Sequence, residues 1–310
     1  MHRAGHAALQ VLLLAVPAVG LADGEPAPGA GEALPAALTA HPHEQQLTDL
    51  TPLNFFTEGW ADPWAHRHRY TPDMALLRVT TNFLERELRF DYVYTNVAEN
   101  KTLDNTQNAS ALLAYGLDRR LMVEVITNYQ WNVNQNGSTT NGAGGGFLAR
   151  LQLVDTPGQS YSFQLKVAPP NKGIGQTTTV LGYYLAGWQD MHELLPFLGR
   201  MGLYFSLDYD NSQGPAKAGA TRNVLNYDVS LAETWTPSDM LVVGNLTTFL
   251  EFYASTPLDG TANGKTSFWI TPGIRFWFLP KNSFTFGVDF EVSNYPTAPE
   301  IYRVNYILNF

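Results

Sequence analysis

Large apolar residues alternate with polar ones along most of the chain from residue 86 to residue 310. In the segment 284–292, for example, Phe284, Phe286 and Phe290 share one phase, whereas the intervening phase carries acidic and small residues. A period of two is typical of a strand with one apolar face and one polar face. The pattern predicts twelve strands, at 86–97, 107–116, 121–131, 147–154, 161–167, 177–188, 201–209, 224–231, 241–254, 267–278, 284–292 and 301–310.

The connections between these segments alternate between turn-like links and longer polar loops. Links such as Leu117–Arg120 and Thr236–Asp239 alternate with loops such as NVNQNGSTTNGAGGG and NSQGPAKAGATR. A transmembrane barrel needs this asymmetry between its two ends, and a soluble sandwich does not. We therefore predict an all-β fold for residues 86–310, a twelve-stranded antiparallel transmembrane up-and-down β-barrel preceded by an N-terminal tail.

Charged residues decide which phase faces lipid. With the opposite phase, Arg150, Lys166 and Arg275 would lie against hydrocarbon, at about 2–4 kcal/mol for each basic residue near the midplane. The apolar phase is therefore predicted to face lipid and the polar phase to face the lumen. Aromatic residues near the strand ends are expected to form interfacial girdles. They are Tyr94, Tyr129, Trp131, Tyr209 and Tyr253 at the outer end, and Trp188, Trp235 and Trp277 at the periplasmic end.

The predicted lumen face carries charges of both signs. These groups either form a network of paired charges that props the wall apart, or some of them line a solute path. The candidate pore-lining residues are Arg89, Asp91, Glu124, Arg150, Lys166, Asp208, Asp228, Glu251, Arg275, Asp289, Glu291 and Arg303. Apolar residues in the same phase favour an amphipathic or aromatic solute. They are Tyr204, Val243, Phe249, Trp269 and Ile307.

The composition agrees with a membrane barrel and argues against several other classes of protein. Charged residues make up 15% of the chain, against about 25% in ordinary soluble domains, and aromatic residues make up 13%. The net charge of −9 argues against nucleic acid as a partner. The chain has no cysteine, which excludes a lipid-modified N-terminus, a disulfide framework and thiolate metal sites.

Three parts precede the predicted barrel. Residues 1–22 have a basic start, an apolar stretch and a small-residue exit, which predict a secretory signal peptide and an address in the outer membrane of a Gram-negative-type bacterium. Residues 23–50 are rich in Ala, Pro and Gly and are expected to form a flexible periplasmic tail. Residues 51–85 are predicted to form a strap or plug and the lead-in to the barrel. The rings expected to pack at the periplasmic mouth are Phe55, Phe56, Trp60, Trp64 and Tyr70.

Histidine is too sparse for a predicted metal site or catalytic site. The pair His41 and His43 and the pair His66 and His68 lack a spacing that fixes a third ligand. After residue 72 the chain has one histidine, His192, in a predicted periplasmic turn, so an outward-facing Ser/His or Asp/His site cannot be built. We expect neither an enzyme nor a bound cofactor or metal.

Three segments resemble the MetA-like family of outer-membrane proteins, which is associated with the meta-pathway of phenol degradation. They are AYGLDRRLMVEV (114–125), VAPPNKGIGQ (167–176) and WITPGIRFWFLPKNSFTFGVDFEV (269–292), and the resemblance extends over residues 75–310. The loop PPNKG departs from the family's more usual Pro-Thr-Gly pattern. The resemblance implies passage of small, often aromatic or hydrophobic, molecules, and it identifies no individual binding residue.

The last ten residues, IYRVNYILNF, resemble the C-terminal signal by which bacterial outer-membrane proteins are recognised for insertion. The residues of this signal are Tyr302, Val304, Tyr306, Leu308 and Phe310. The resemblance implies the barrel-assembly machinery as a partner. The sequence thus predicts an outer-membrane channel or diffusion-type transporter for a small-molecule solute, surrounded by outer-membrane lipid. The alternative is a sealed structural or interaction barrel whose surface loops bind a partner.

Overall fold

The computed structural model describes most of the barrel region and two short segments before it. The described residues are 49–58, 76–81, 83–84, 86–97, 103–171, 173, 176–191, 195, 201–215, 218–237, 240, 242–279, 281–293 and 300–310. All of them belong to one compact unit, Gln45–Phe310. The predicted signal peptide, almost all of the predicted tail, and the residues Trp60, Trp64 and Tyr70 lie outside the described residues.

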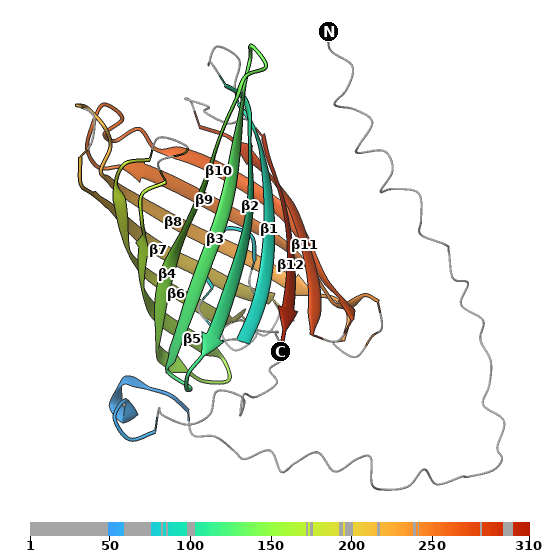
Figure 1. Ribbon diagram of the computed structural model, residues 1–310. Coiled ribbons are helices and arrows are strands. Elements are labelled where there is room, and N and C mark those ends of the chain that lie inside the picture. Colours follow the sequence, from blue (N-terminus) through green and yellow to red (C-terminus); the bar gives the residue numbers. More distant parts are fainter. Residues whose placement is uncertain are drawn as a thin grey trace, which may run out of the picture. The chain divides into compact units, whose positions relative to one another are not determined.

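Twelve antiparallel strands close into one barrel (Figure 1). Each strand pairs with the next along the chain, and β1 pairs with β12 over the register Glu87↔Asn309 to Asn96↔Glu300. The strands are β1 (Arg86–Asn96), β2 (Leu103–Gly116), β3 (Leu121–Asn134), β4 (Thr139–Asp155), β5 (Gln159–Ala168), β6 (Thr179–Asp190), β7 (Met201–Gln213), β8 (Asn223–Thr234), β9 (Gly244–Pro257), β10 (Ser267–Leu279), β11 (Asn282–Glu291) and β12 (Glu300–Asn309). The predicted fold class is confirmed.

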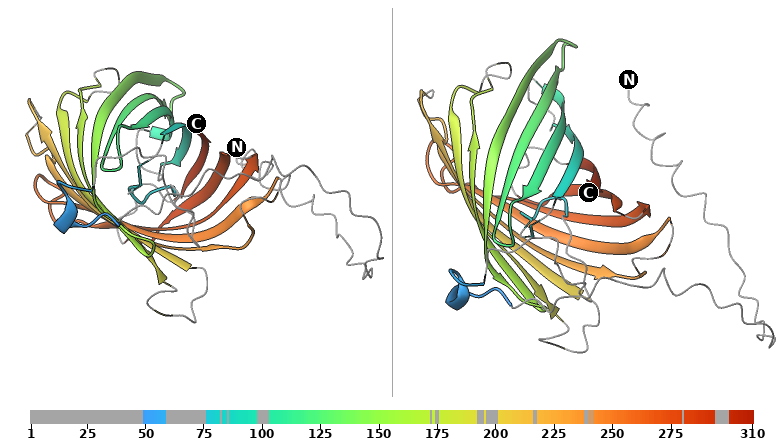
Figure 2. Two further views of the ribbon diagram at one scale, coloured as in Figure 1. Left: turned by 90° about the horizontal axis from the view of Figure 1, so that it is seen from below. Right: turned by 60° about the horizontal axis from the view of Figure 1, so that its bottom comes forward.

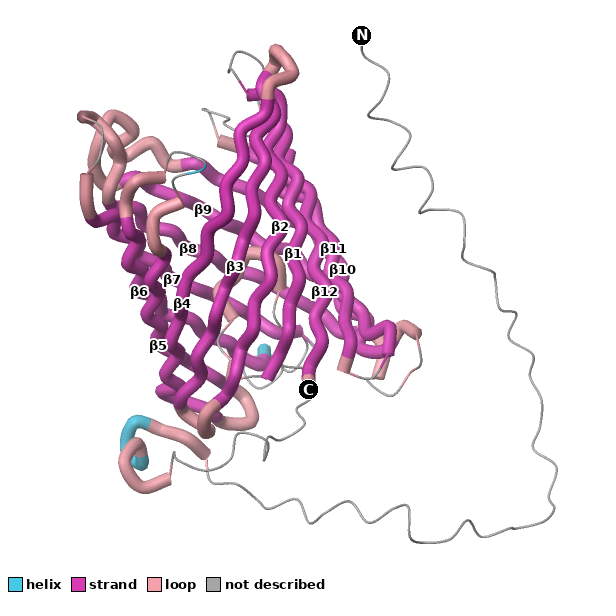
Figure 3. Tube along the Cα trace, viewed as in Figure 1, coloured by secondary structure: helices cyan, strands magenta, loops and turns pink. Residues whose placement is uncertain are grey.

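Helix is almost absent from the described chain, as Figure 3 shows. A short 3₁₀ helix, η2 (Pro52–Asn54), precedes the barrel. None of the helices among the described residues has the length and apolar character needed to cross a membrane.

The largest departure from the predicted strands lies in the hairpin of β3 and β4. The stretch 132–146 reads as a loop because it is polar and rich in glycine, yet β3 extends to Asn134 and β4 begins at Thr139. Gly137 makes the tight turn with a φ of 78°. Within β4, a Cβ at Gly145 would lie 2.5 Å from the carbonyl oxygen of Ile126. Glycine therefore permits the close approach of the two strands here, and its presence does not signal a loop.

The side chains alternate between the outside and the inside of the barrel as predicted. Phe147 on β4 is 62% exposed, whereas its neighbours on the same strand, Leu148 and Gly146, are buried or half-buried. Phe147 continues a row of outward apolar residues on adjacent strands, pairing with Val125 on β3 and Val167 on β5. The outer surface is therefore apolar where a membrane barrel must meet hydrocarbon.

The hydrophobic core lies inside the barrel, between the wall and the segment before β1. Leu76, Val79 and Phe83 of this segment form one buried cluster with wall residues Trp188 and Tyr204. The two views of Figure 2 show the ring of strands around this interior. We call residues 76–84 the lumen segment.

Three residues predicted for the aromatic girdles lie on the inward phase instead. One of them, Trp277, lies opposite the buried Ser283 in the β10–β11 register. Trp188 is 0% exposed and packs edge-on against Phe83, with ring centroids 6.0 Å apart. Tyr253 donates its hydroxyl hydrogen to the side-chain oxygen of Asn226, which also faces inward. Tyr253 shares its phase with the predicted lumen residue Glu251, so alternation by itself places it inward and the girdle assignment overlooked this. For Trp188, both phases of β6 carry aromatic residues, so the pattern did not decide which ring faces outward. Among the apolar residues predicted for the lumen, Val243 lies in the turn before β9 and is exposed, whereas Tyr204, Phe249, Trp269 and Ile307 are buried.

Candidate functional site

All twelve predicted pore-lining residues lie on the inward phase of their strands. Most of them either are buried or stand two positions from a buried polar residue on the same strand, as Lys166 does from Gln164 and Arg303 does from Asn305. Asp91 is half-buried and lies four positions from the buried Glu87, on the same phase of β1. The twelve residues are Arg89 and Asp91 on β1, Glu124 on β3, Arg150 on β4, Lys166 on β5, Asp208 on β7, Asp228 on β8, Glu251 on β9, Arg275 on β10, Asp289 and Glu291 on β11, and Arg303 on β12.

One group of these residues joins β3 and β4 to the end of the lumen segment. Arg150 Nη2 and Glu124 Oε1 form an ion pair at 2.6 Å, with side chains only 4% and 5% exposed. The other terminal nitrogen of Arg150, Nη1, donates to the backbone carbonyl of Phe83. The neighbouring Gln164 donates its amide hydrogen to the carbonyl of Thr81 at 2.5 Å. The wall therefore satisfies backbone acceptors of a segment whose described residues lie outside every helix and strand.

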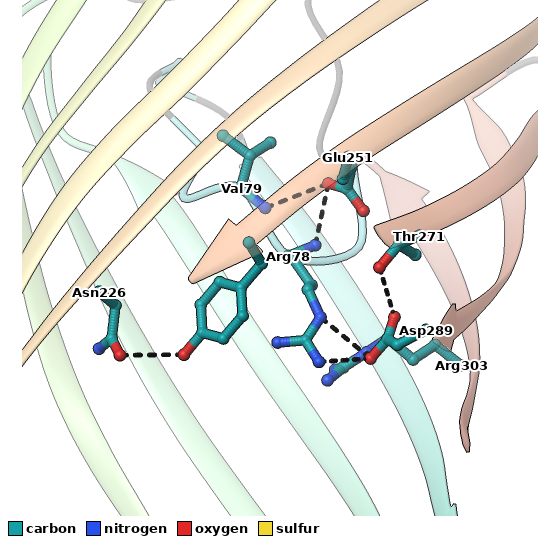
Figure 4. Close-up of polar contacts among 8 residues, drawn as sticks. Arg78, Val79, Asn226, Glu251, Thr271, Asp289 and Arg303 are labelled. Carbon is teal, nitrogen blue, oxygen red and sulfur yellow. Dashed lines mark hydrogen bonds and ion pairs between the residues drawn. The ribbon is translucent and has the colours of Figure 1, made fainter. Parts of the chain in front are cut away.

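A second group binds the lumen segment at Arg78 (Figure 4). The Nε and Nη2 atoms of Arg78 donate to Asp289 Oδ2 at 2.9 Å and 2.6 Å. Asp289 also accepts from Arg303 Nε at 2.8 Å and, through Oδ1, from the Thr271 hydroxyl at 2.7 Å. The backbone N–H groups of Arg78 and Val79 both donate to Glu251 Oε1, each at 3.1 Å. Two residues of the segment are thus bound directly by β9 and β11. Thr271 of β10 and Arg303 of β12 in turn bind the Asp289 carboxylate.

Acidic side chains form a diagonal row across β7, β8 and β9. Asp208 accepts a hydrogen bond from the Thr80 hydroxyl at 2.8 Å. Asp228 is 2% exposed, and neither of its carboxylate oxygens has a hydrogen-bond partner among the described residues. Asp228 lies opposite Tyr253 in the β8–β9 register, so Glu251 is its diagonal neighbour on the same face. We call Asp208, Asp228 and Glu251 the acidic row.

Four of the remaining charged residues make local contacts. Arg89 Nε donates to Asp91 at 2.9 Å. The ammonium of Lys166 lies 5.6 Å from the centre of the Tyr184 ring, which is within the range of a cation–π contact. Glu291 accepts a hydrogen bond from the Ser293 hydroxyl at 2.7 Å. The lumen face thus combines paired charges with aromatic surfaces.

Of the two alternatives predicted for this part of the chain, a strap or a plug, the two rings that the structure describes fit the strap. Phe56 is 87% exposed, and Phe55 stacks over the guanidinium of Arg120 at the turn between β2 and β3. A β-bridge between Leu50 and Asp155 fastens this stretch to the barrel end, so residues 49–58 resemble a strap. The residues that enter the barrel are those of the lumen segment, which the sequence assigned to the lead-in. The available signal was Arg78, which is the one charged residue in the stretch 76–84 and is flanked by Leu77 and Val79.

The described residues contain no cluster of three or more His, Cys, Asp or Glu side chains suited to a metal ion. The histidine pairs at His41 and His43 and at His66 and His68 lie outside the described residues, as does His192.

The closed barrel is similar to solved structures of outer-membrane proteins. An outer membrane channel from Pseudomonas putida F1 aligns with a TM-score of 0.54 and 11% identity, over 79% of this chain and 99% of that one. The NanC porin and the KdgM porin align with TM-scores of 0.49 and 0.46, each at 10% identity over 72% of this chain and 99% of theirs. The chain matches no family model and no curated protein. The similarity to the Pseudomonas channel shows that the chain has the fold of an outer-membrane β-barrel.

Proposed function

We propose that this protein is an outer-membrane channel or diffusion-type transporter for small molecules. One observation carries the proposal: a closed barrel with an apolar outer face encloses an inward face on which charged residues of both signs recur on nearly every strand. Such a lining can exchange the hydration shell of a polar solute for side-chain contacts. Selection would follow from the width of the lumen and its mixed charges, without covalent chemistry.

Aromatic and hydrophobic molecules are the solute class that we assign to this channel. The resemblance to the MetA-like family supports this class, and so do the rings on the inward face. Tyr204, Phe249 and Trp269 lie beside the charged groups and pack against the lumen segment, so they would offer apolar surfaces to an amphipathic solute once that segment leaves.

A sealed barrel is the second candidate, and the lumen segment favours it. The segment is bound to the wall at Arg78, Val79, Thr80, Thr81 and Phe83. A barrel filled in this way can act as a rigid support for partner-binding outer loops.

Single-channel conductance in planar bilayers distinguishes these two candidates. The informative variant replaces residues 76–81 by a Gly/Ser linker of the same length, and its control replaces residues 52–57, in the strap, by the same linker. A channel that is open or only intermittently plugged gives current in the wild type, and the current rises in the 76–81 variant but not in the control. Silence in the wild type and in both variants would reject the channel and favour the sealed barrel.

The route to the membrane completes the proposal. Export would begin with removal of residues 1–22, and the barrel-assembly machinery would bind the outward residues of β12, namely Tyr302, Val304, Tyr306, Leu308 and the following Phe310. Cell fractionation with a Phe310→Ala variant tests this route, because loss of the terminal ring should lower the amount of folded barrel in the outer membrane. An unchanged amount would count against the insertion signal.

A further inference from the structure

The guanidinium of Arg78 lies among groups that together suit an organic cation. Its Cζ atom is 4.1 Å from the ring centre of Tyr253 and 5.0 Å from that of Trp269. Two of its nitrogens donate to Asp289, which is 0% exposed. Two aromatic faces and a desolvated carboxylate are the elements of a cation-recognition site, because ring quadrupoles and charge-assisted hydrogen bonds both favour a positive charge.

The barrel wall builds this site from residues that are fixed without Arg78. Tyr253 and Trp269 are directly opposite each other in the β9–β10 register, and their ring centres are 5.2 Å apart. Asn226 fixes the hydroxyl of Tyr253. Thr271 and Arg303 fix the carboxylate of Asp289 from two neighbouring strands. A site whose parts are held by the wall keeps its geometry when its occupant leaves.

Carboxyl groups also outnumber guanidinium groups next to the site. The acidic row and Asp289 contribute four carboxyl groups to this side of the lumen. The guanidinium groups beside them are those of Arg78 and Arg303, and both of these bind Asp289. Asp228 stands out because it is nine-tenths buried and has no hydrogen-bond partner among the described residues. A buried carboxylate without a partner is costly, and a nearby cation lowers that cost.

We infer that Tyr253, Trp269 and Asp289, flanked by the acidic row, form a binding site for small guanidinium or ammonium solutes, which Arg78 occupies as an internal pseudo-ligand. This inference goes beyond the aromatic and hydrophobic solute class proposed above, and it rests on the proposed channel for its biological meaning. A tethered group acts at an effective concentration of the order of millimolar. A free cation must therefore displace Arg78, and its apparent affinity for the wild type is low until the lumen segment leaves the site.

Calorimetry with the full-length protein in detergent tests the site directly. The ligand is methylguanidinium, and methylurea serves as its uncharged analogue of the same shape. We expect Arg78→Gln to bind methylguanidinium at least about tenfold more tightly than the wild type, a difference in binding free energy of about 1.4 kcal/mol. The same variant should not bind methylurea. Arg222→Gln removes an exposed arginine from the outer end of the barrel and should bind as the wild type does.

The inference is overturned if folded Arg78→Gln binds methylguanidinium no more tightly than the wild type, or if it binds methylurea equally well. Folding is checked by the heat-dependent shift of the barrel band on a gel. If Arg78→Gln does not fold, the 76–81 linker variant, which also lacks Arg78, takes its place. Its binding of methylguanidinium and of methylurea is then measured in the same way. Adding Trp269→Leu to either variant should weaken binding at least tenfold, and undiminished binding would place the cation elsewhere.

Current measurements separate a failure of this site from a failure of the channel. In a conducting variant, methylguanidinium should block the current at the concentrations at which calorimetry detects binding. Binding without current in any variant would refute the channel and leave the cation site standing. Current without binding or block would refute the site and leave the channel standing.

Discussion

Replacing Arg150 by methionine tests whether the inward charges hold the barrel together as a bonded network. Methionine retains the length of the apolar stem but removes the guanidinium, so Glu124 loses its ion-pair partner at 2.6 Å. The carbonyl of Phe83 loses its donor as well. Glu124 remains buried, because β3 and its neighbours fix its position on the inward face.

The expected cost follows from the burial of the pair. Breaking a buried ion pair by removing one partner costs about 3–5 kcal/mol, because the other charge stays desolvated and uncompensated. The double variant Glu124→Gln with Arg150→Met removes both charges and should be more stable than Arg150→Met alone. The two substitutions should therefore couple by about 0.5–3 kcal/mol in a double-mutant cycle. The hydrogen bond to Phe83 is lost in both variants that lack Arg150, so it cancels from the coupling.

The assay is equilibrium unfolding in urea from phospholipid vesicles, followed by tryptophan fluorescence. Arg222→Met is the control, since its side chain is exposed and its loss should change the unfolding free energy by no more than about 0.5 kcal/mol. A cost below about 1 kcal/mol for Arg150→Met, or strict additivity in the cycle, would refute the network and would mean that water reaches these charges.

Two further predictions concern the outer loops and the lipid face. In the loop after β9, hydrogen bonds from the backbone N–H groups of Arg222 and Asn223 lower the pKa of Asp259. Its stabilising effect is therefore fully present above the ordinary carboxyl pKa of about 3.9 and is lost as pH falls through the lower folded-state pKa. The protection of the Asn223 amide against hydrogen exchange, taken as the ratio of its intrinsic rate to its observed rate, should fall over that window, and an equal fall in Asp259→Asn would contradict this cause. On the lipid face, Val125→Arg should destabilise the barrel in vesicles by about 2–4 kcal/mol whereas Val125→Leu should not, and equal stability of the two would mean that Val125 does not meet hydrocarbon.

The sequence by itself determined the barrel wall. Alternation is a local property: once a strand forms, neighbouring side chains must point to opposite faces, and the cost of charge in hydrocarbon then selects the outward phase. Strand number, closure, and the inward position of residues such as Arg150 and Asp289 therefore followed from counting along the chain. Hairpin ends were less predictable, because backbone pairing continues through glycine and polar residues in β4 without any apolar signal.

Only the tertiary structure decided what fills the lumen. Arg78 meets Asp289 across 211 residues of sequence, and its backbone N–H meets Glu251 across 173. No spacing along the chain encodes such contacts, since they arise when closure of the barrel brings the inward faces of distant strands around one segment. Closure likewise decided the position of Trp188, which faces inward although aromatic residues on both phases of β6 had left the choice open.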